Sequence, residues 1–216
     1  MGGHPAGEVA AVIAAEAIQR FYDDQGSPRP ADAAGLPTSP QGFLAASLKH
    51  ANAAIRARAA REPETRRMGA AIVAMHATST GFCLAHVGHA RCYRLRDREL
   101  QKLTEDHAQL TEYIWRGVPL DIAESRPDRH TLSRGLGVRE RVDVTVWMDD
   151  ARPGDLVLLC SNGLYGVLSD AELAAVLAGK SELEATADAL IAFADARRAA
   201  DDATCVVLRW AATPAA

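Results

Sequence analysis

The stretch GDLVLLCSNGL, residues 154–164, joins a short apolar run to an abrupt polar turn. Pro153 precedes it, so a Pro-Gly-Asp turn leads into the apolar run. A run of this length bounded by turn residues is typical of a buried strand. The glycine turn after it predicts that Ser161 and Asn162 lie at the edge of a sheet, where polar side chains from several strand ends can converge.

Two other segments combine a strand with a polar turn in the same way. They are VGHAR, residues 87–91, and ADDAT, residues 200–204, which precedes the last apolar run. Strand ends on one rigid sheet can bring such side chains onto a shared ion. Each segment alone is a weak signal, because an Asp or Asn at a strand end is more often a turn former than a ligand.

The rest of the chain alternates between helical and strand patterns. Short apolar runs rich in β-branched residues predict strands, over residues 68–77, 81–87, 92–96, 99–103, 142–148, 155–160 and 203–210. Apolar residues at helical spacing predict helices, over residues 7–24, 41–61, 170–177 (capped by Ser169) and 182–197, with a mostly helical insert at 107–124. Four prolines between residues 26 and 40 predict a loop.

Composition and element order predict a single α+β domain over residues 1–216. The chain has 48% hydrophobic and 24% charged residues, an ordinary globular composition. Strands fall in adjacent hairpins, and helices are grouped before and after them. This order favours layers built on antiparallel sheets over a repeating β-α-β unit.

Charge and cysteine usage argue against several classes of partner. The formal net charge of -4 would repel nucleic acid and anionic lipid. No apolar stretch reaches the roughly 18 residues of a membrane span, and no export signal opens the chain. The widely spaced cysteines are interpreted as reduced core residues. We therefore expect a cytoplasmic protein with neither nucleic-acid nor membrane partners.

The order and spacing of these segments resemble those of the bacterial type 2C metal-dependent serine/threonine protein phosphatases, the PPM family. The opening MGGHPAGEVA, residues 1–10, is similar to the end of the family's Asp-Gly-Met-Gly-Gly-His motif. The segment 68–70 resembles its Met-Gly-Thr-Thr strand start. The segment 84–107 resembles its Ala-His-Val-Gly-Asp-Ser-Arg and Thr-Glu-Asp-His signatures. The segment 130–137 resembles its His-Val-Leu-Thr-Arg-Ala-Leu-Gly. The segment 154–164 resembles its Gly-Asp-Xaa-Xaa-Leu-Leu-Cys-Ser-Asp-Gly-Leu, and the segment 201–204 resembles its Asp-Asn-Ile-Thr. The resemblance covers essentially the whole chain.

The resemblance implies the fold and the chemistry of that family. The expected fold is an α-β-β-α sandwich of antiparallel sheets flanked by helices, without the N-terminal strands that would precede Met1. Sheet edges left open in this way would invite a partner or self-association. The family holds two Mg²⁺ or Mn²⁺ ions with carboxylates and directs a bridging water at phosphoserine or phosphothreonine.

Departures from the family pattern fall on this metal site. The Asp-Gly that bridges both ions would lie before Met1, so Gly2 belongs to a degenerate motif. Asn162 replaces the metal aspartate of Ser-Asp-Gly, Gly166 replaces the aspartate four residues later, and His89 replaces the aspartate of Val-Gly-Asp. Asp201 alone matches a core metal ligand. A start codon placed too late would explain the first loss but not the other three.

These departures predict a pseudophosphatase, with no assigned catalytic residue, that acts in phospho-signalling as a binding or regulatory protein. Its partner would be a phosphoprotein or a serine/threonine kinase. Asp201, with Asn162 as a weak second ligand, would hold one Mn²⁺ or Mg²⁺ ion weakly or none. The alternative is an active Mn²⁺- or Mg²⁺-dependent serine/threonine phosphatase that dephosphorylates kinase targets.

The histidines of these motifs have simpler interpretations than metal binding. His86 and His89 could form a transition-metal pair, but one lies in a strand and the other follows a glycine, so their side chains need not point the same way. His107 is expected to cap or pack at the start of a helix.

Overall fold

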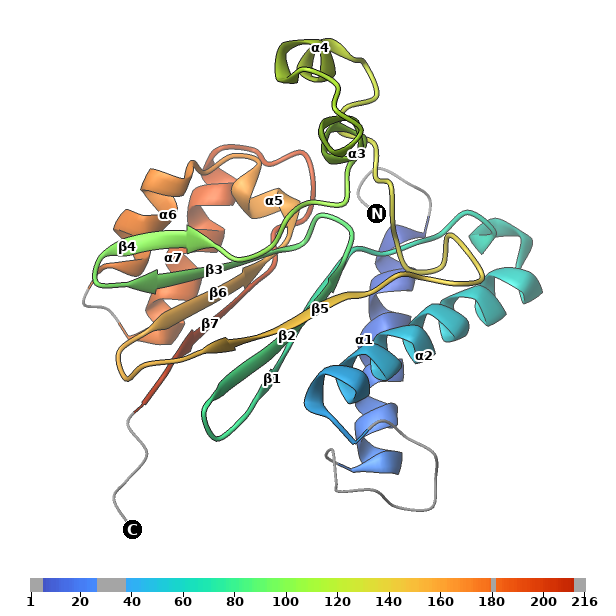
Figure 1. Ribbon diagram of the computed structural model, residues 1–216, viewed down its shortest axis with the longest axis horizontal. Coiled ribbons are helices and arrows are strands. Elements are labelled where there is room, and N and C mark those ends of the chain that lie inside the picture. Colours follow the sequence, from blue (N-terminus) through green and yellow to red (C-terminus); the bar gives the residue numbers. More distant parts are fainter. Residues whose placement is uncertain (1–5, 27–37, 180–181, 212–216) are drawn as a thin grey trace.

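The computed structural model describes residues 6–26, 38–179 and 182–211. The strands within these residues are β1 Ile72–Ala77, β2 Gly81–Val87, β3 Arg91–Arg96, β4 Glu99–Lys102, β5 Thr145–Asp150, β6 Leu156–Cys160 and β7 Cys205–Arg209. They form two sheets, with the orders β1-β2-β5 and β4-β3-β6-β7, in which every neighbouring pair is antiparallel. The two sheets pack face to face (Figure 1).

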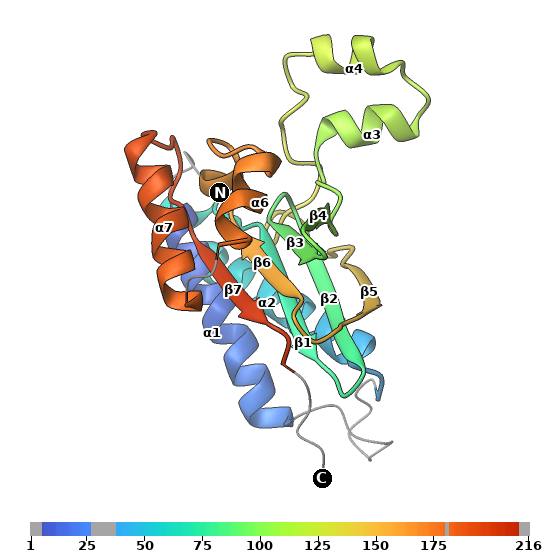
Figure 2. The same ribbon diagram turned by 90° about the vertical axis from the view of Figure 1, so that its left-hand side faces the viewer.

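Helices cover the outer face of each sheet, which confirms the expected sandwich. On the three-stranded sheet lie α1 Gly7–Gln25 and α2 Pro40–Arg61, and α2 contacts all three strands. On the four-stranded sheet lie α5 Asn162–Tyr165, α6 Asp170–Leu177 and α7 Leu183–Ala196 (Figure 1); Figure 2 shows α6 and α7 from the side. A short 3-10 turn, η1 Pro63–Thr65, follows α2, while α3 Gln109–Trp115 and α4 Leu120–Ser125 project from one end of the sandwich. Among the described helices, none combines the length and apolar character needed to cross a membrane.

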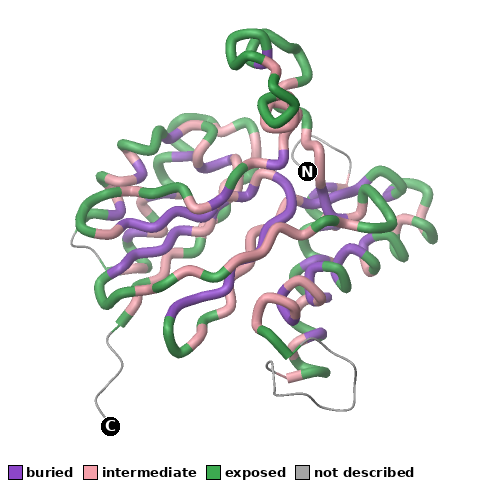
Figure 3. Tube along the Cα trace, viewed as in Figure 1, coloured by how far each residue is buried: buried purple, intermediate pink, exposed green. Residues whose placement is uncertain are grey.

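Three apolar clusters hold the four layers together. One joins α1 and α2 to the three-stranded sheet, another lies between the sheets, and the third joins the four-stranded sheet to α5, α6 and α7. Strand β2 serves the first two, because Cys83 and Ala85 face the helices whereas Phe82 and Leu84 face the other sheet. It is therefore buried along its whole length (Figure 3).

Most predicted elements are present with shifted ends. The predicted helix over 170–177 coincides with α6, and Ser169 caps it in a capping box with Glu172. The predicted strand over 68–77 begins later, at Ile72, because Ala70 pairs with Leu136 in an isolated bridge outside the sheet. The strand predicted over 142–148 likewise runs from Thr145 to Asp150. Helix α5 was not predicted, since four residues are too few to show a helical period.

His107 does not cap a helix; α3 has Ala108 as its N-cap, and the imidazole packs into the core instead. Its Nδ1 accepts a hydrogen bond from the Gly88 backbone N–H (3.1 Å), and its Nε2 lies 3.0 Å from the Thr145 hydroxyl. Its ring stacks on His86, with the ring centroids 4.3 Å apart. The His107 ring therefore holds the glycine turn that follows β2 and packs against His86.

Both histidines are held neutral by their surroundings. Burial lowers the pKa of His86 to about 4 and the pKa of His107 to about 3. The nearby Asp106 carboxylate raises both pKa values but does not overcome burial, and Arg134 lowers both. With Nδ1 accepting from Gly88, neutral His107 carries its proton on Nε2 and donates it to Thr145.

The free energy of unfolding should fall as the pH falls from about 6.5 towards 4. In this window the two histidines take up protons in the unfolded chain but stay neutral in the folded protein, so each can cost about 1.4 kcal/mol per pH unit. Urea titrations at pH 7, 6 and 5 would measure the slope. His107→Gln removes one titrating ring and should give a shallower slope than the wild type. Equal slopes in the two proteins would contradict this account.

Gly88 should be far less replaceable than a glycine of similar backbone geometry elsewhere. Gly88 has φ +97°, and an added Cβ would lie 2.7 Å from the Ala71 Cβ, whereas Gly154 has φ +95° and nothing within 4 Å of that position. Gly154→Ala should lose only the strain of a positive φ, about 1 kcal/mol. Gly88→Ala should lose about 2–4 kcal/mol in urea unfolding, because overpacking adds to the strain. Similar losses for both would show that crowding at Ala71 does not matter.

Candidate functional site

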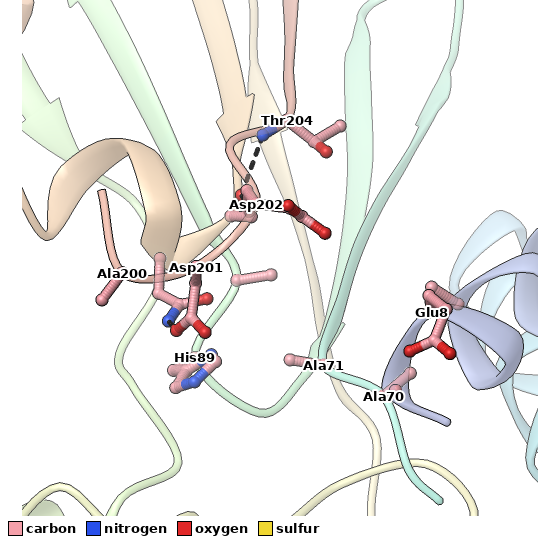
Figure 4. Close-up of a pocket in the computed structure, with 13 residues that line it drawn as sticks. Glu8, Ala70, Ala71, His89, Ala200, Asp201, Asp202 and Thr204 are labelled. Atoms are coloured by element: carbon pink, nitrogen blue, oxygen red, sulfur yellow. Dashed lines mark hydrogen bonds between the residues drawn. The ribbon is translucent and has the colours of Figure 1, made fainter. Parts of the chain in front are cut away.

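A pocket of about 440 Å³ lies where the ends of β2 and β6, the start of β7 and the first turn of α1 meet. Its polar lining comes from Glu8, His89, Ser161, Asn162, Asp201, Asp202 and Thr204. The three polar turns recognised in the sequence therefore do converge on one place (Figure 4). Two of the predicted site positions are not part of this lining: Gly166 lies outside the pocket, and Gly2 lies outside the described residues.

The antiparallel register of β6 and β7 brings Asn162 next to Asp201. Cys160 lies directly opposite Cys205. The turn that leaves β6 and the loop that enters β7 therefore lie side by side at the same end of the sheet. The Asn162 carboxamide N–H donates a hydrogen bond to the Asp201 carboxylate. This contact joins the one family-matching carboxylate to the residue that stands where the family has a second one.

Ser161 ties the same two segments together through three hydrogen bonds. Its backbone N–H donates to the Thr204 carbonyl (3.0 Å), and its hydroxyl accepts from the Thr204 N–H (2.9 Å). The hydroxyl also donates to the Asp202 carbonyl (3.0 Å). Gly163 permits this close approach, because a Cβ there would lie 2.5 Å from the carbonyl oxygens of Asp201 and Asp202. The turn is thus held by packing as well as by polar contacts.

His89 lies beside Asp201 at the wall of the pocket (Figure 4). Its Nδ1 is buried and, within the described residues, has no hydrogen-bond partner. Burial lowers the pKa of His89, although the Asp106 and Asp201 carboxylates act in the opposite direction. The Tyr165 hydroxyl fixes the turn by donating to the His89 carbonyl (2.8 Å). A neutral imidazole therefore occupies the position where the family pattern has an aspartate.

Gly166 ends α5 on the exposed side of that helix. Its backbone is right-handed, with φ -70°, so conformation alone does not require glycine. A Cβ at this position would lie 2.7 Å from the Asn162 carbonyl oxygen. Any side chain here, including the family's aspartate, therefore requires the α5 turn to shift.

Sequence reasoning missed one residue that lines the pocket, Glu8, and an ion pair near His89, between Arg91 and Asp106. Glu8, in the first turn of α1, faces the pocket from the side opposite His89 and Asp201 (Figure 4). Arg91 makes a bidentate pair with Asp106 (2.9 and 2.7 Å), and its guanidinium stacks 3.6 Å from the centre of the Tyr165 ring. The sequence signals for the Arg91–Asp106 pair were the arginine that ends VGHAR and the aspartate of the segment that resembles Thr-Glu-Asp-His.

The residues around the pocket do not fit a pair of divalent ions. Hard divalent ions take several oxygen ligands, mostly carboxylates. Within the described residues, no group of three or more His, Cys, Asp or Glu side chains could hold a metal ion. The Asn162 carboxamide also turns its N–H, rather than its oxygen, towards Asp201. That donor satisfies the carboxylate in a way that a cation otherwise would.

No protein-family model matches the chain. The serine/threonine protein phosphatase PstP of Mycobacterium tuberculosis is 35% identical over 175 residues, which cover 79% of this chain and 31% of PstP. The serine/threonine phosphatase stp of Listeria monocytogenes is 28% identical over 209 residues, which cover 96% of this chain and 81% of that protein. The chain thus spans about a third of the length of mycobacterial PstP.

Solved structures give the same relationship. The crystal structure of the M. tuberculosis phosphatase PstP/Ppp superposes with a TM-score of 0.83 at 31% identity and covers 98% of this chain and 86% of that one. The PstP catalytic domain in complex with two manganese ions gives a TM-score of 0.75 at 31% identity, with 96% and 82% covered. Sequence and fold therefore agree that this chain belongs to the bacterial PPM-type family of metal-dependent serine/threonine protein phosphatases.

Proposed function

We propose that this chain is a catalytically impaired PPM-type protein, a pseudophosphatase, that acts in phospho-signalling as a binding or regulatory protein. The observation that carries the proposal is the hydrogen bond from the Asn162 carboxamide to the Asp201 carboxylate. An aspartate at position 162 would place a second carboxylate beside Asp201 and would need a cation between them. The asparagine instead donates a side-chain N–H to the Asp201 carboxylate. The junction is therefore stable without an ion.

Charge supports the same conclusion. Two divalent cations need several anionic oxygens to offset their mutual repulsion. Position 162 offers an amide, position 89 an imidazole and position 166 no side chain at all. Asp201 with the amide oxygen of Asn162 could hold one Mn²⁺ or Mg²⁺ ion weakly, but only after the carboxamide turned over and gave up its present bond.

A phosphoprotein or a serine/threonine kinase is the partner that we propose. The relatives are named as serine/threonine phosphatases, so their substrates carry phosphorylated side chains. The described residues that line the pocket include three acids, Glu8, Asp201 and Asp202, and neither a lysine nor an arginine. Without ions the pocket would repel a phosphate group, so recognition would rely on the protein surface around it. The four free thiols fit a reducing, cytoplasmic setting.

The alternative is an active Mn²⁺- or Mg²⁺-dependent phosphatase acting on kinase targets. It is favoured by the carboxylates of Glu8 and Asp202, which line the same pocket as Asp201. It is also in keeping with the two manganese ions in the related PstP catalytic domain.

A phosphothreonine-peptide assay with Mn²⁺ separates the two functions. We expect turnover no higher than that of Asp201→Ala, and we expect no rescue by Asn162→Asp combined with Gly166→Asp. Mycobacterial PstP serves as the positive control. Turnover by the wild type that Asp201→Ala abolishes would establish the enzyme and end the proposal.

The amide–carboxylate contact should also make the thermal stability of the wild type insensitive to metal. Millimolar Mn²⁺ and EDTA should give the same Tm. Asn162→Asp places two carboxylates in contact, so it should lose about 1–2 kcal/mol in EDTA. Mn²⁺ should restore that loss, since binding at 100 times Kd contributes about 2.7 kcal/mol.

Asp201→Asn is the matched control for this experiment. It keeps a hydrogen-bonded pair at positions 162 and 201 but offers no carboxylate, so it should show no response to Mn²⁺. A wild-type Tm that rises by several degrees in Mn²⁺ would show that the present residues do hold an ion.

A further inference from the structure

Two cysteines face each other across the strands that enter and leave the pocket. Cys160 is the last residue of β6 and Cys205 is the first residue of β7, and the register of the two strands pairs them directly. Directly opposite residues in an antiparallel pair point to the same face of the sheet. Both thiols accordingly belong to the apolar cluster beneath α5, α6 and α7.

The hydrogen-bond pattern places this pair at a position where side chains come closest. At one end of the ladder the Ser161 N–H donates to the Thr204 carbonyl (3.0 Å), and at the other the Trp210 N–H donates to the Asp155 carbonyl (2.9 Å). Hydrogen-bonded and non-hydrogen-bonded pairs alternate along an antiparallel ladder. Cys160 and Cys205 therefore form a non-hydrogen-bonded pair, whose Cα atoms lie about 4.5 Å apart, within the range of a disulfide.

The other cysteines are less suited to bridge to Cys160. Cys92, on β3, pairs with Leu159 and belongs to the cluster between the sheets, so its thiol points to the opposite face. Cys83 lies on β2, in the other sheet. Cys160 is 3% exposed, whereas Cys205 is partly exposed and lies on β7, which pairs on one side only among the described strands. A reagent would therefore reach Cys205 first.

We propose that Cys160 and Cys205 are a redox-responsive dithiol that closes to a cross-strand disulfide when a low-molecular-weight disulfide such as oxidised glutathione accumulates. The proposal rests on the register of β6 and β7 and is independent of the proposed function. The Cys205 thiolate attacks the small disulfide, forms a mixed disulfide and releases one thiol. The Cys160 thiolate then attacks the Cys205 sulfur and releases a second thiol. The protein loses two protons and two electrons, and the small disulfide gains them to become two thiols.

The exchange should be slow in the folded protein. Burial raises the pKa of Cys160 to about 12, and burial also raises the pKa of Cys205. The Cys205 thiol in addition donates to the Ala187 carbonyl at 3.8 Å. Local opening of the edge strand β7 would expose both thiols, so the switch would respond to sustained rather than brief oxidation.

The bond would act directly on the pocket. Cys160 is two residues before Asn162, and Cys205 is four residues after Asp201. The disulfide would tie covalently the junction that Ser161 and Thr204 now hold by hydrogen bonds. It would close a loop of roughly 45 residues that contains α5, α6 and α7, and it would limit separation of the two segments on which Asn162 and Asp201 lie.

The test is equilibration of the wild-type protein in glutathione buffers of increasing oxidised fraction, followed by alkylation and peptide mapping without reduction. We expect a Cys160–Cys205 linkage and a Tm about 5–10 °C above that of the reduced protein, reversed by dithiothreitol. A Cys92–Cys160 linkage, or a stable glutathione adduct on Cys205 without a protein disulfide, would overturn the proposal. So would disulfide-linked dimers as the main product.

Variants supply the matched controls. Cys205→Ala should abolish the rise in Tm on oxidation. Cys92→Ala should retain it; Cys92 is the control because it follows Arg91, the residue of β3 that pairs with Cys160. Cys205→Ser offers a second test should the alanine variant prove too unstable to measure. A rise in Tm that survives the loss of Cys205 would refute the assignment, and the peptide map of the wild type decides the linkage independently of any variant.

Discussion

The antiparallel register of β6 with β7 is the constraint on which the pocket depends. Pairing Cys160 with Cys205 places the end of one strand beside the start of the other, although the two are more than 40 residues apart in sequence. A shift of one residue would turn every side chain of β7 to the opposite face. Leu208 would then leave the cluster between the sheets, and Val207 would leave the cluster beneath α7. The apolar pattern of β7 thus fixes the position of Asp201.

Within that frame, the chemistry of the junction is decided by one functional group. A carboxylate can be satisfied by a cation or by hydrogen-bond donors, and these alternatives compete for the same oxygens. Asp201 accepts from the Asn162 carboxamide, and the neighbouring Ser161 and Thr204 satisfy each other's backbone groups. Hydrogen bonds between protein groups thus connect these two segments, at the place where the family pattern has metal ligands.

The sequence predicted the layers and the meeting of the three polar turns, because apolar period and motif order report which face is buried and where strands end. It could not predict that Glu8 faces Asp201 across the pocket, since that contact depends on how α1 packs. The role of His107 was also beyond it, because a histidine beside a helix start looks the same whether it caps the helix or turns inward to hold Gly88. The donor orientation of Asn162 likewise depends on how its turn packs against the loop that carries Asp201.

Different residues determine the fold and the polar lining of the pocket. The fold can therefore persist while the residues of the pocket change. The three apolar clusters contain Cys160, Leu164, Tyr165 and Cys205, the immediate neighbours of the polar turns, but none of Glu8, His89, Asn162 and Asp201. Burial of the apolar neighbours contributes most of the stability, at about 25 cal/mol per Å². The polar residues at the strand ends contribute little by comparison once each carboxylate has a donor. An amide and an imidazole can therefore stand where the family pattern has metal ligands while the sandwich and its sheet register are kept.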